Sequence, residues 1–180
     1  MIVMLNLFWQ GFQGWNFIKE AFMCNVSLND DTDYGQCFVC GPNNLSGLRL
    51  RFARDGDSVK TKFRGGLQHQ GFPGRIHGGV ITALLDEVMS RVSLLEGIWT
   101  MTARIDIRFR NPVAVNEDVT VVGCKSNNRR GIWKVRGSVI LDDGSTAAEA
   151  VGTFLEVPDE TLAKITENYP ILSSEWMSRA

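Results

Sequence analysis

The chain has 180 residues, of which 44% are hydrophobic and 22% charged, and its formal net charge is -1. This length fits one domain with a core large enough to fold without disulfides, and four scattered cysteines do not form a disulfide scaffold. The near-zero charge excludes a global attraction to nucleic acid or to an anionic membrane surface.

The N-terminal region is rich in aromatic residues, but polar residues interrupt it too often for a membrane span. It lacks the basic start and the small-residue cleavage site of a signal peptide, so we expect a cytoplasmic protein. Turn-forming residues separate this arm from the rest of the chain. The expected organisation is an arm over 1–36, a main domain over 37–157 and a helical tail over 158–180.

A long helix dominates the first half of the main domain. Alternating residues predict two strands before it, over 48–52 and 59–63. The helix begins at Gly78, and its apolar residues share one broad face: Val80, Ile81, Leu84, Leu85, Val88, Met89 and Val92. Small residues surround Asp86 on the opposite stripe, which indicates close approach by another chain or a ligand. Glu87 and Arg91 are four residues apart and predict a solvated edge.

Four further strands are predicted over 101–109, 119–125, 132–141 and 146–157. Strict alternation in the first places Ile105 and Thr102 on opposite faces. The intervening turns predict consecutive hairpins and therefore an antiparallel sheet. A helix with one broad apolar face would pack across that sheet, which makes an α+β domain. Pro158 begins a short final helix.

The start of the long helix carries candidate chemistry. Gly78 and Gly79 leave backbone N–H groups at the positive end of the helix, and Asp86 stands eight residues after Gly78 among aliphatic side chains. Donors for a developing oxyanion and a carboxylate near apolar walls are the parts needed to attack a carbonyl group.

Cys37-Phe38-Val39-Cys40 has the spacing of half a zinc knuckle. A structural zinc site needs four ligands, and the chain has no second cysteine pair and only two histidines. We therefore expect no metal here, and interpret the thiols as small apolar groups packed in a turn.

Over about residues 37–157 the chain resembles the hotdog-fold acyl-CoA thioesterases of the PaaI-like type. The resemblance rests on the cysteine-containing turn 37–41, on 70–79, on Asp86 nine positions after His77, on Thr102, and on the Asn111-Pro112 strand end. It implies a six-stranded antiparallel sheet wrapped around one long central helix. It also implies hydrolysis of an acyl-CoA thioester without any cofactor, since coenzyme A is part of the substrate.

The resemblance assigns roles to five residues. Asp86 is the catalytic base or nucleophile, and the Gly78 N–H polarises the thioester carbonyl. Thr102 orients the attacking water, and Gln70 supplies a side-chain amide beside the carbonyl. His77 either fixes the loop or takes part directly.

Substrate binding is expected from Gly79 and from cations that hold the phosphates of coenzyme A. Arg129 and Arg130, in a flexible turn over 126–131, are the first candidates, and Arg108 and Arg110 are the second. The acyl pocket is expected near four large side chains, which do not identify the acyl group: Phe72, Met89, Trp99 and Met101.

Helix geometry predicts an active site shared between subunits. Eight residues of helix separate Gly78 from Asp86 by about 12 Å, whereas both must act within about 3 Å of one carbonyl. If both are catalytic, they come from different subunits of a homodimer, or of a tetramer built from dimers.

Two other functions stay open. A 3-hydroxyacyl-thioester dehydratase would use His77 and Asp86 as its acid and base. A non-catalytic acyl-CoA-binding protein would need a partner domain, and the sequence has no helix-turn-helix or basic segment for nucleic acid.

Overall fold

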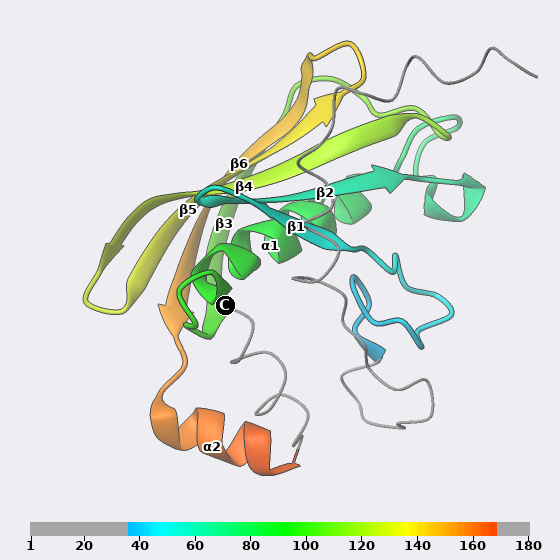
Figure 1. Ribbon diagram of the computed structural model, residues 1–180. Coiled ribbons are helices and arrows are strands. Elements are labelled where there is room, and N and C mark those ends of the chain that lie inside the picture. Colours follow the sequence, from blue (N-terminus) through cyan, green and yellow to red (C-terminus); the bar gives the residue numbers. More distant parts are fainter. Residues whose placement is uncertain (1–35, 169–180) are drawn as a thin grey trace, which may run out of the picture.

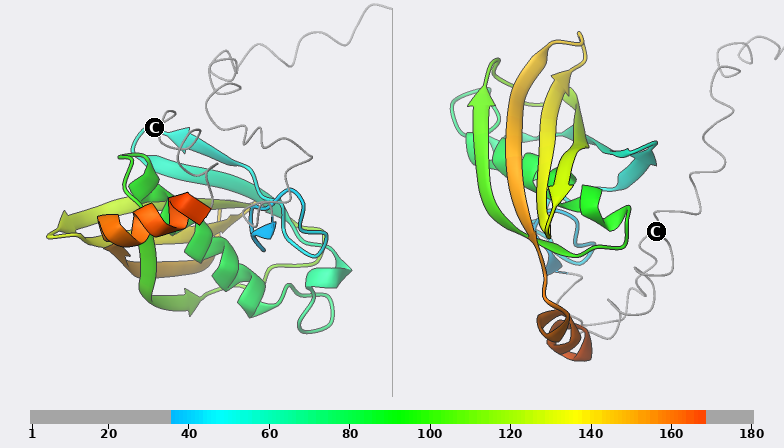
Figure 2. Two further views of the ribbon diagram at one scale, coloured as in Figure 1. Left: turned by 90° about the horizontal axis from the view of Figure 1, so that it is seen from below. Right: turned by 90° about the vertical axis from the view of Figure 1, so that its left-hand side faces the viewer.

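A computed structural model describes residues 36–168, in which a curved antiparallel sheet wraps around one long helix (Figure 1, Figure 2). The elements are β1 (Phe52–Asp55), β2 (Ser58–Arg64), the short 3-10 helix η2 (Leu67–His69), α1 (Gly78–Leu94), β3 (Thr100–Phe109), β4 (Asp118–Arg129), β5 (Ile132–Leu141), β6 (Thr146–Glu156) and α2 (Asp159–Asn168). The predicted α+β class and the hotdog arrangement are confirmed.

The six strands follow the order β1-β2-β4-β5-β6-β3, and every neighbouring pair is antiparallel. The expectation of consecutive hairpins is right for β4, β5 and β6 but wrong for β3, which pairs with β6 at the edge of the sheet. Residues 110–117 carry the chain across to β4 and include a turn in which Glu117 N–H donates to Ala114 O. This crossover is held by the loop before α1, since Ile76 N–H donates to Val113 O at 2.9 Å and Arg75 bridges Ala114.

Two predicted boundaries need correction. The alternating residues 48–51 are not a strand, because Arg49 adopts a left-handed φ of 51° and Leu50 N–H bonds to Val39 O. At the other end of the sheet, β4 continues to Arg129, and the expected flexible turn over 126–131 is only a two-residue hairpin. Its residues Arg130 and Gly131 have φ of 52° and 75°, the left-handed values that suit a tight β-hairpin.

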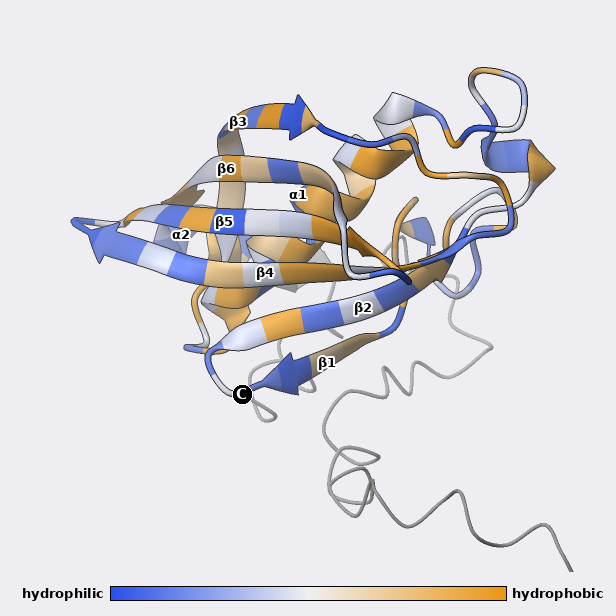
Figure 3. Cartoon of the chain, turned by 90° about the horizontal axis from the view of Figure 1, so that it is seen from above, coloured by the Kyte–Doolittle hydropathy of each residue, from blue (hydrophilic) through white to orange (hydrophobic). Residues whose placement is uncertain are grey.

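The core lies between α1 and the concave face of the sheet. Apolar and polar residues alternate along the strands, so that one face of the sheet is apolar (Figure 3). Six of the seven predicted apolar helix residues are buried, and Val80 is half-buried. The largest fully buried side chains include Trp133 and Phe154 from the sheet and Leu84, Leu85 and Met89 from α1. Met89 is therefore a core residue, and the expectation that it borders an acyl pocket is wrong for this chain.

The helix approaches the middle of the sheet closely because two paired positions carry no side chain. Gly123 of β4 lies opposite Gly137 of β5. A Cβ at Gly123 would stand 2.6 Å from the Val88 carbonyl oxygen, too close for any side chain. This contact fixes the height of α1 above the sheet, and with it the position of Asp86.

One face of α1 was predicted incorrectly. Glu87 and Arg91 do not form a solvated edge: Arg91 is only 6% exposed and the Glu87 side chain 18%. Arg91 donates to Glu87 at 2.9 and 2.7 Å and lies 4.2 Å from the centre of the Phe52 ring. The segment 37–52 covers this side of the helix, which the helical pattern alone cannot reveal.

The ends of the chain extend beyond the described residues. The predicted arm over 1–36 lies outside them except for its last residue, and so does the end of the predicted tail. The tail begins as expected, with α2 following Pro158. None of the described helices combines the length and the apolar character needed to cross a bilayer.

Candidate active site

The start of α1 leaves one backbone donor exposed. His77 is the N-cap, and its Nδ1 accepts a hydrogen bond from Gly79 N–H at 2.8 Å. The Gly79 N–H predicted to face substrate is thus used within the chain. Gly78 is exposed, and within residues 36–168 its N–H has no hydrogen-bond partner. This arrangement leaves the Gly78 N–H available to an oxygen atom placed beside the helix start.

The loop before α1 is braced by its own side chains. Gln70 Oε1 accepts from Gly74 N–H at 2.7 Å, and Gln70 also pairs with Ile76 across the loop. His77 N–H bonds back to His69 O at 2.8 Å. Both predicted loop residues, Gln70 and His77, therefore hold the loop in shape, and the Nδ1 of His77 is occupied by the cap.

Asp86 meets Thr102 across the gap between α1 and β3. The Thr102 hydroxyl donates to Asp86 Oδ1 at 2.7 Å, although the residues are sixteen positions apart. Burial raises the pKa of Asp86, while the Thr102 hydrogen bond opposes this shift and nearby Glu87 adds to it. The result is a fixed, partly desolvated carboxylate of the kind used as a base or nucleophile.

A β-bulge makes the Asp86–Thr102 contact possible. The pairing of β3 with β6 shifts register between Thr102 and Arg104. The expected strict alternation is therefore wrong at Ala103: Thr102 turns toward α1, on the same side as Ile105 and Ile107, which pack against the core. The bulge re-aims one hydroxyl without disturbing the remaining strand.

The small-residue stripe of α1 runs along β3. Besides the Asp86 contact, Ser93 Oγ lies 3.0 Å from Thr100 Oγ1, and Ser93 is buried. Near the helix start, a Cβ at Gly78 would lie 3.6 Å from Phe109 Cζ. The close approach predicted for this stripe is thus made, at least in part, by β3 of the same chain. Asp86 lies by the beginning of β3 and Gly78 by its end.

Residues 73–148 match the family model described as Thioesterase superfamily. This match covers 76 of the 180 residues, all of them within the described domain. Acyl-coenzyme A thioesterase THEM4 of Mus musculus is 30% identical over 120 residues, which are 63% of this chain and 51% of that protein. The chain thus spans about half the length of the curated relatives it matches.

Solved structures of the thioesterase superfamily agree with the fold. One solved structure, of a thioesterase superfamily protein, is 26% identical to this chain. The match covers 67% of this chain and 60% of the solved chain, with a TM-score of 0.64. The PaaI protein of E. coli, from the phenylacetic acid degradation operon, is 14% identical with a TM-score of 0.59, covering 62% of this chain and 81% of that one. At this identity PaaI supports the fold alone. The family resemblance seen in the sequence is confirmed.

The predicted arginines lie at two ends of the sheet. Arg129 and Arg130 are exposed at the β4–β5 hairpin. Beside this hairpin, Ile132 of β5 pairs with Leu155 of β6, and Leu155 pairs in turn with Met101 of β3. The hairpin therefore shares the end of the sheet at which Thr102 lies. Arg108 is exposed near the other end, and Arg110 is ion-paired with Glu149.

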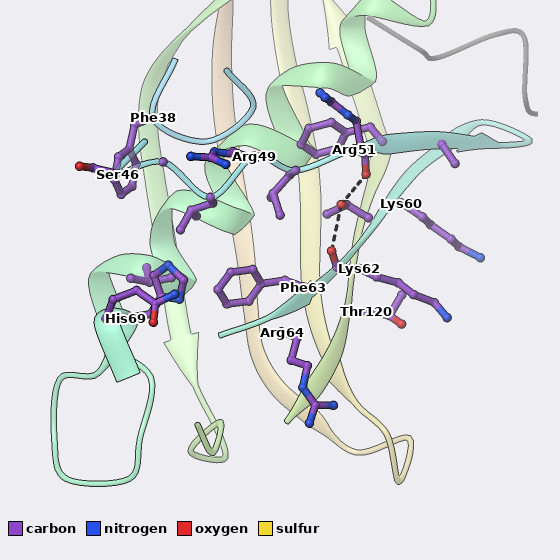
Figure 4. Close-up of a pocket in the computed structure, with 18 of the residues that line it drawn as sticks. Phe38, Ser46, Arg49, Arg51, Lys60, Lys62, Phe63, Arg64, His69 and Thr120 are labelled. Atoms are coloured by element: carbon purple, nitrogen blue, oxygen red, sulfur yellow. Dashed lines mark hydrogen bonds between the residues drawn. The ribbon is translucent and has the colours of Figure 1, made fainter. Parts of the chain in front are cut away.

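A separate groove of about 1580 Å³ lies along β1 and β2 (Figure 4). Phe63 lines it, and its cations include Arg49, Arg51, Lys60 and Lys62. Its lining includes neither Asp86, Thr102 nor Gly78. The groove is therefore distinct from the candidate site formed by Asp86 and Thr102.

The raised pKa of Asp86 predicts a stability gain on Asp86→Asn. A carboxyl group whose pKa is raised by folding stabilises the fold below its unfolded pKa, and this contribution is lost as pH rises through its folded pKa. At neutral pH the ionised form is therefore the less favourable one, while Asn is uncharged and still accepts from Thr102. We expect the variant to unfold at a higher temperature than wild type at neutral pH, and the difference to shrink in acid, as measured by calorimetry.

The exposed Asp118→Asn, in β4 and away from the proposed interface, is the matched control and should show no such gain. A wild-type protein more stable than Asp86→Asn at neutral pH would contradict the prediction, because it would mean that the ionised carboxylate is favourably solvated.

Proposed function

We propose that this chain hydrolyses the thioester bond of an acyl-coenzyme A. The observation that carries the proposal is the half-buried Asp86 carboxylate held at 2.7 Å by the Thr102 hydroxyl on a thioesterase-superfamily domain. The name of the mouse relative supports the substrate class. Release of free thiol from a panel of acyl-CoA substrates, followed with a thiol reagent, is the direct test.

In this mechanism Asp86 acts as a base on water or attacks the thioester carbon directly. Thr102 orients the water or the carboxylate oxygen, and the Gly78 N–H donates to the carbonyl oxygen as it becomes negative. The C–S bond then breaks, and the coenzyme A thiolate leaves and takes up a proton. The acyl group ends as the free acid. These steps use no metal or other cofactor.

We further propose that each active site is built by two copies of the chain. Gly78 and Asp86 are eight residues apart on α1, a separation of about 12 Å, so one chain cannot bring both to one carbonyl. β3 has a strand neighbour only on its β6 side within the described sheet. An unpaired edge of ten residues is a natural surface for pairing with a second β3.

Antiparallel pairing of two β3 strands would complete the site. A two-fold axis near the middle of β3, around Ile105, would bring Thr102 of one copy near Phe109 of the other. Thr102 touches Asp86, and Phe109 lies against Gly78. The pairing would therefore bring Asp86 toward Gly78 of the partner subunit. Met101 and Phe109, 59% and 55% exposed, would be covered.

The dehydratase alternative has less support. It needs His77 as an acid or base, but the His77 Nδ1 already accepts the Gly79 N–H that caps α1. In neutral His77 this leaves the proton on Nε2, which suits a hydrogen-bond donor better than a base. Hydrolysis needs only the carboxylate and the backbone donor.

Arg129→Ala combined with Arg130→Ala should raise KM for acyl-CoA by about tenfold or more while changing kcat little. These guanidiniums lie at the end of the sheet near Thr102, and phosphate contacts far from the reacting carbon stabilise ground and transition states alike. Steady-state kinetics on acyl-CoA and on a short thioester without the nucleotide would separate the two effects, because the short substrate should be unaffected.

Arg51→Ala with Lys62→Ala provides the matched control, since it removes two exposed cations from the groove instead. A rise in KM confined to this control would move the phosphate site to the groove. Equal losses on both substrates in the Arg129, Arg130 variant would make those arginines structural.

A further inference from the structure

Two thiols and a carboxylate converge where the 37–41 turn meets α1. The ligand atoms of Cys37, Cys40 and Glu87 all lie within 4.8 Å of one another. Cys40 is buried, while Cys37 and Glu87 are half-buried. Among the residues that the structure describes, this is the one group of three such side chains close enough to share a metal ion.

The turn that carries the cysteines directs hydrogen bonds at sulfur. Gly41 N–H donates to Cys37 O at 2.9 Å and closes the turn. The backbone N–H groups of Val39 and Cys40 donate to the Cys37 sulfur, and so does the Cys40 thiol. Backbone donors of this kind hold a metal-binding sulfur in a fixed orientation.

The charges around the cluster match a divalent cation. Arg91 binds Glu87 through Oε1, and a carboxylate has a second oxygen that can bind a metal. Metal binding would displace the protons of both thiols, and two thiolates and one carboxylate, opposed by one guanidinium, would then carry two negative charges in a poorly hydrated space. Such charges need compensation, and a divalent ion supplies it.

The donor set favours zinc. Thiolate ligands select zinc over magnesium or calcium, which prefer oxygen. Zinc–sulfur bonds of about 2.3 Å in a tetrahedron place the two sulfurs about 3.8 Å apart. This spacing fits within the 4.8 Å limit of the cluster. Three protein ligands leave the fourth position for water.

We propose that Cys37, Cys40 and Glu87 bind a zinc ion that ties the 37–41 turn to α1. The site has three protein ligands, one fewer than the closed site of a zinc knuckle, and it does not depend on the proposed hydrolysis. It revises the sequence-based expectation of no metal, because the third ligand comes from a helix position predicted to face solvent. The ion would secure α1 beside Asp86, the residue before Glu87.

Cobalt titration of the 180-residue chain, reduced and stripped of metal with a chelator, tests the site. We expect thiolate-to-cobalt charge-transfer absorption that saturates near about one equivalent and disappears when zinc is added. Cys37→Ser and Cys40→Ser should lose this absorption, and Glu87→Gln should bind at least about tenfold more weakly. Cys124→Ser, which removes a thiol outside the cluster, should behave as wild type.

A second measurement keeps the test valid if the serine variants do not fold. Zinc should protect Cys37 and Cys40 of the wild-type protein from alkylation, as read by mass spectrometry, and leave Cys124 reactive. Absence of the absorption in the folded wild type would overturn the proposal. So would absorption that persists in the folded Cys37→Ser and Cys40→Ser variants, or alkylation of both cysteines that zinc does not slow.

Discussion

Asp86→Asn should abolish thiol release from acyl-CoA, with kcat lower by at least about 100-fold. Asn has nearly the same shape and can still accept the Thr102 hydrogen bond, so the local structure should survive. It cannot take a proton from water or attack the thioester carbon as an anion. Acyl-CoA binding, measured by calorimetry, should persist because the carboxylate does not hold the substrate.

Asp118→Asn is the control for the loss of one carboxylate, because Asp118 is exposed and ion-paired with Arg64 where β4 meets β2, away from β3. Its kcat should stay within about twofold of wild type, as expected of a surface residue outside the site. If Asp86→Asn kept activity within threefold, Asp86 would be removed from the mechanism. A wild-type protein that bound acyl-CoA but released no thiol would instead be a non-catalytic binder.

The sequence predicted the frame of this site because the frame depends on local periodicity. The α1 helix needs only its apolar face and the glycines at its start, and Gly78 is its first residue, as expected. The strands over 132–141 and 59–63 alternate cleanly and were located to within one residue at each end. Contacts made within one element were therefore predictable.

The features that the sequence did not reveal depend on contacts between distant segments. The bulge at Ala103 is a mismatch between β3 and β6, and it turns Thr102 toward Asp86 against the alternation of its own strand. The burial of Glu87 comes from the segment before β1, which no helical pattern contains. The edge position of β3 was missed for the same reason, since hairpin signals describe only neighbouring strands.

The edge position of β3 leads to the second major expectation, that inactive variants restore activity when mixed. Gly78→Pro removes the backbone N–H proposed to stabilise the oxyanion, and proline is tolerated in the first turn of a helix. Asp86→Asn removes the carboxylate. If a site combines Asp86 of one copy with Gly78 of the other, a mixed dimer has one site with both defects and one site with neither.

The test mixes equal amounts of the two variants under conditions that exchange subunits. Half of the randomly formed dimers are then mixed, and each mixed dimer has one intact site out of two. The mixture should therefore recover about a quarter of wild-type activity. Each variant alone should stay inactive, and circular dichroism should show that both fold. Mixing two batches of Asp86→Asn carrying different tags is the control for exchange without complementation. If isolated mixed dimers stayed inactive, each chain would build its own site. The 12 Å separation along α1, estimated from about 1.5 Å of rise per residue, would then exclude Gly78 as the donor that serves Asp86.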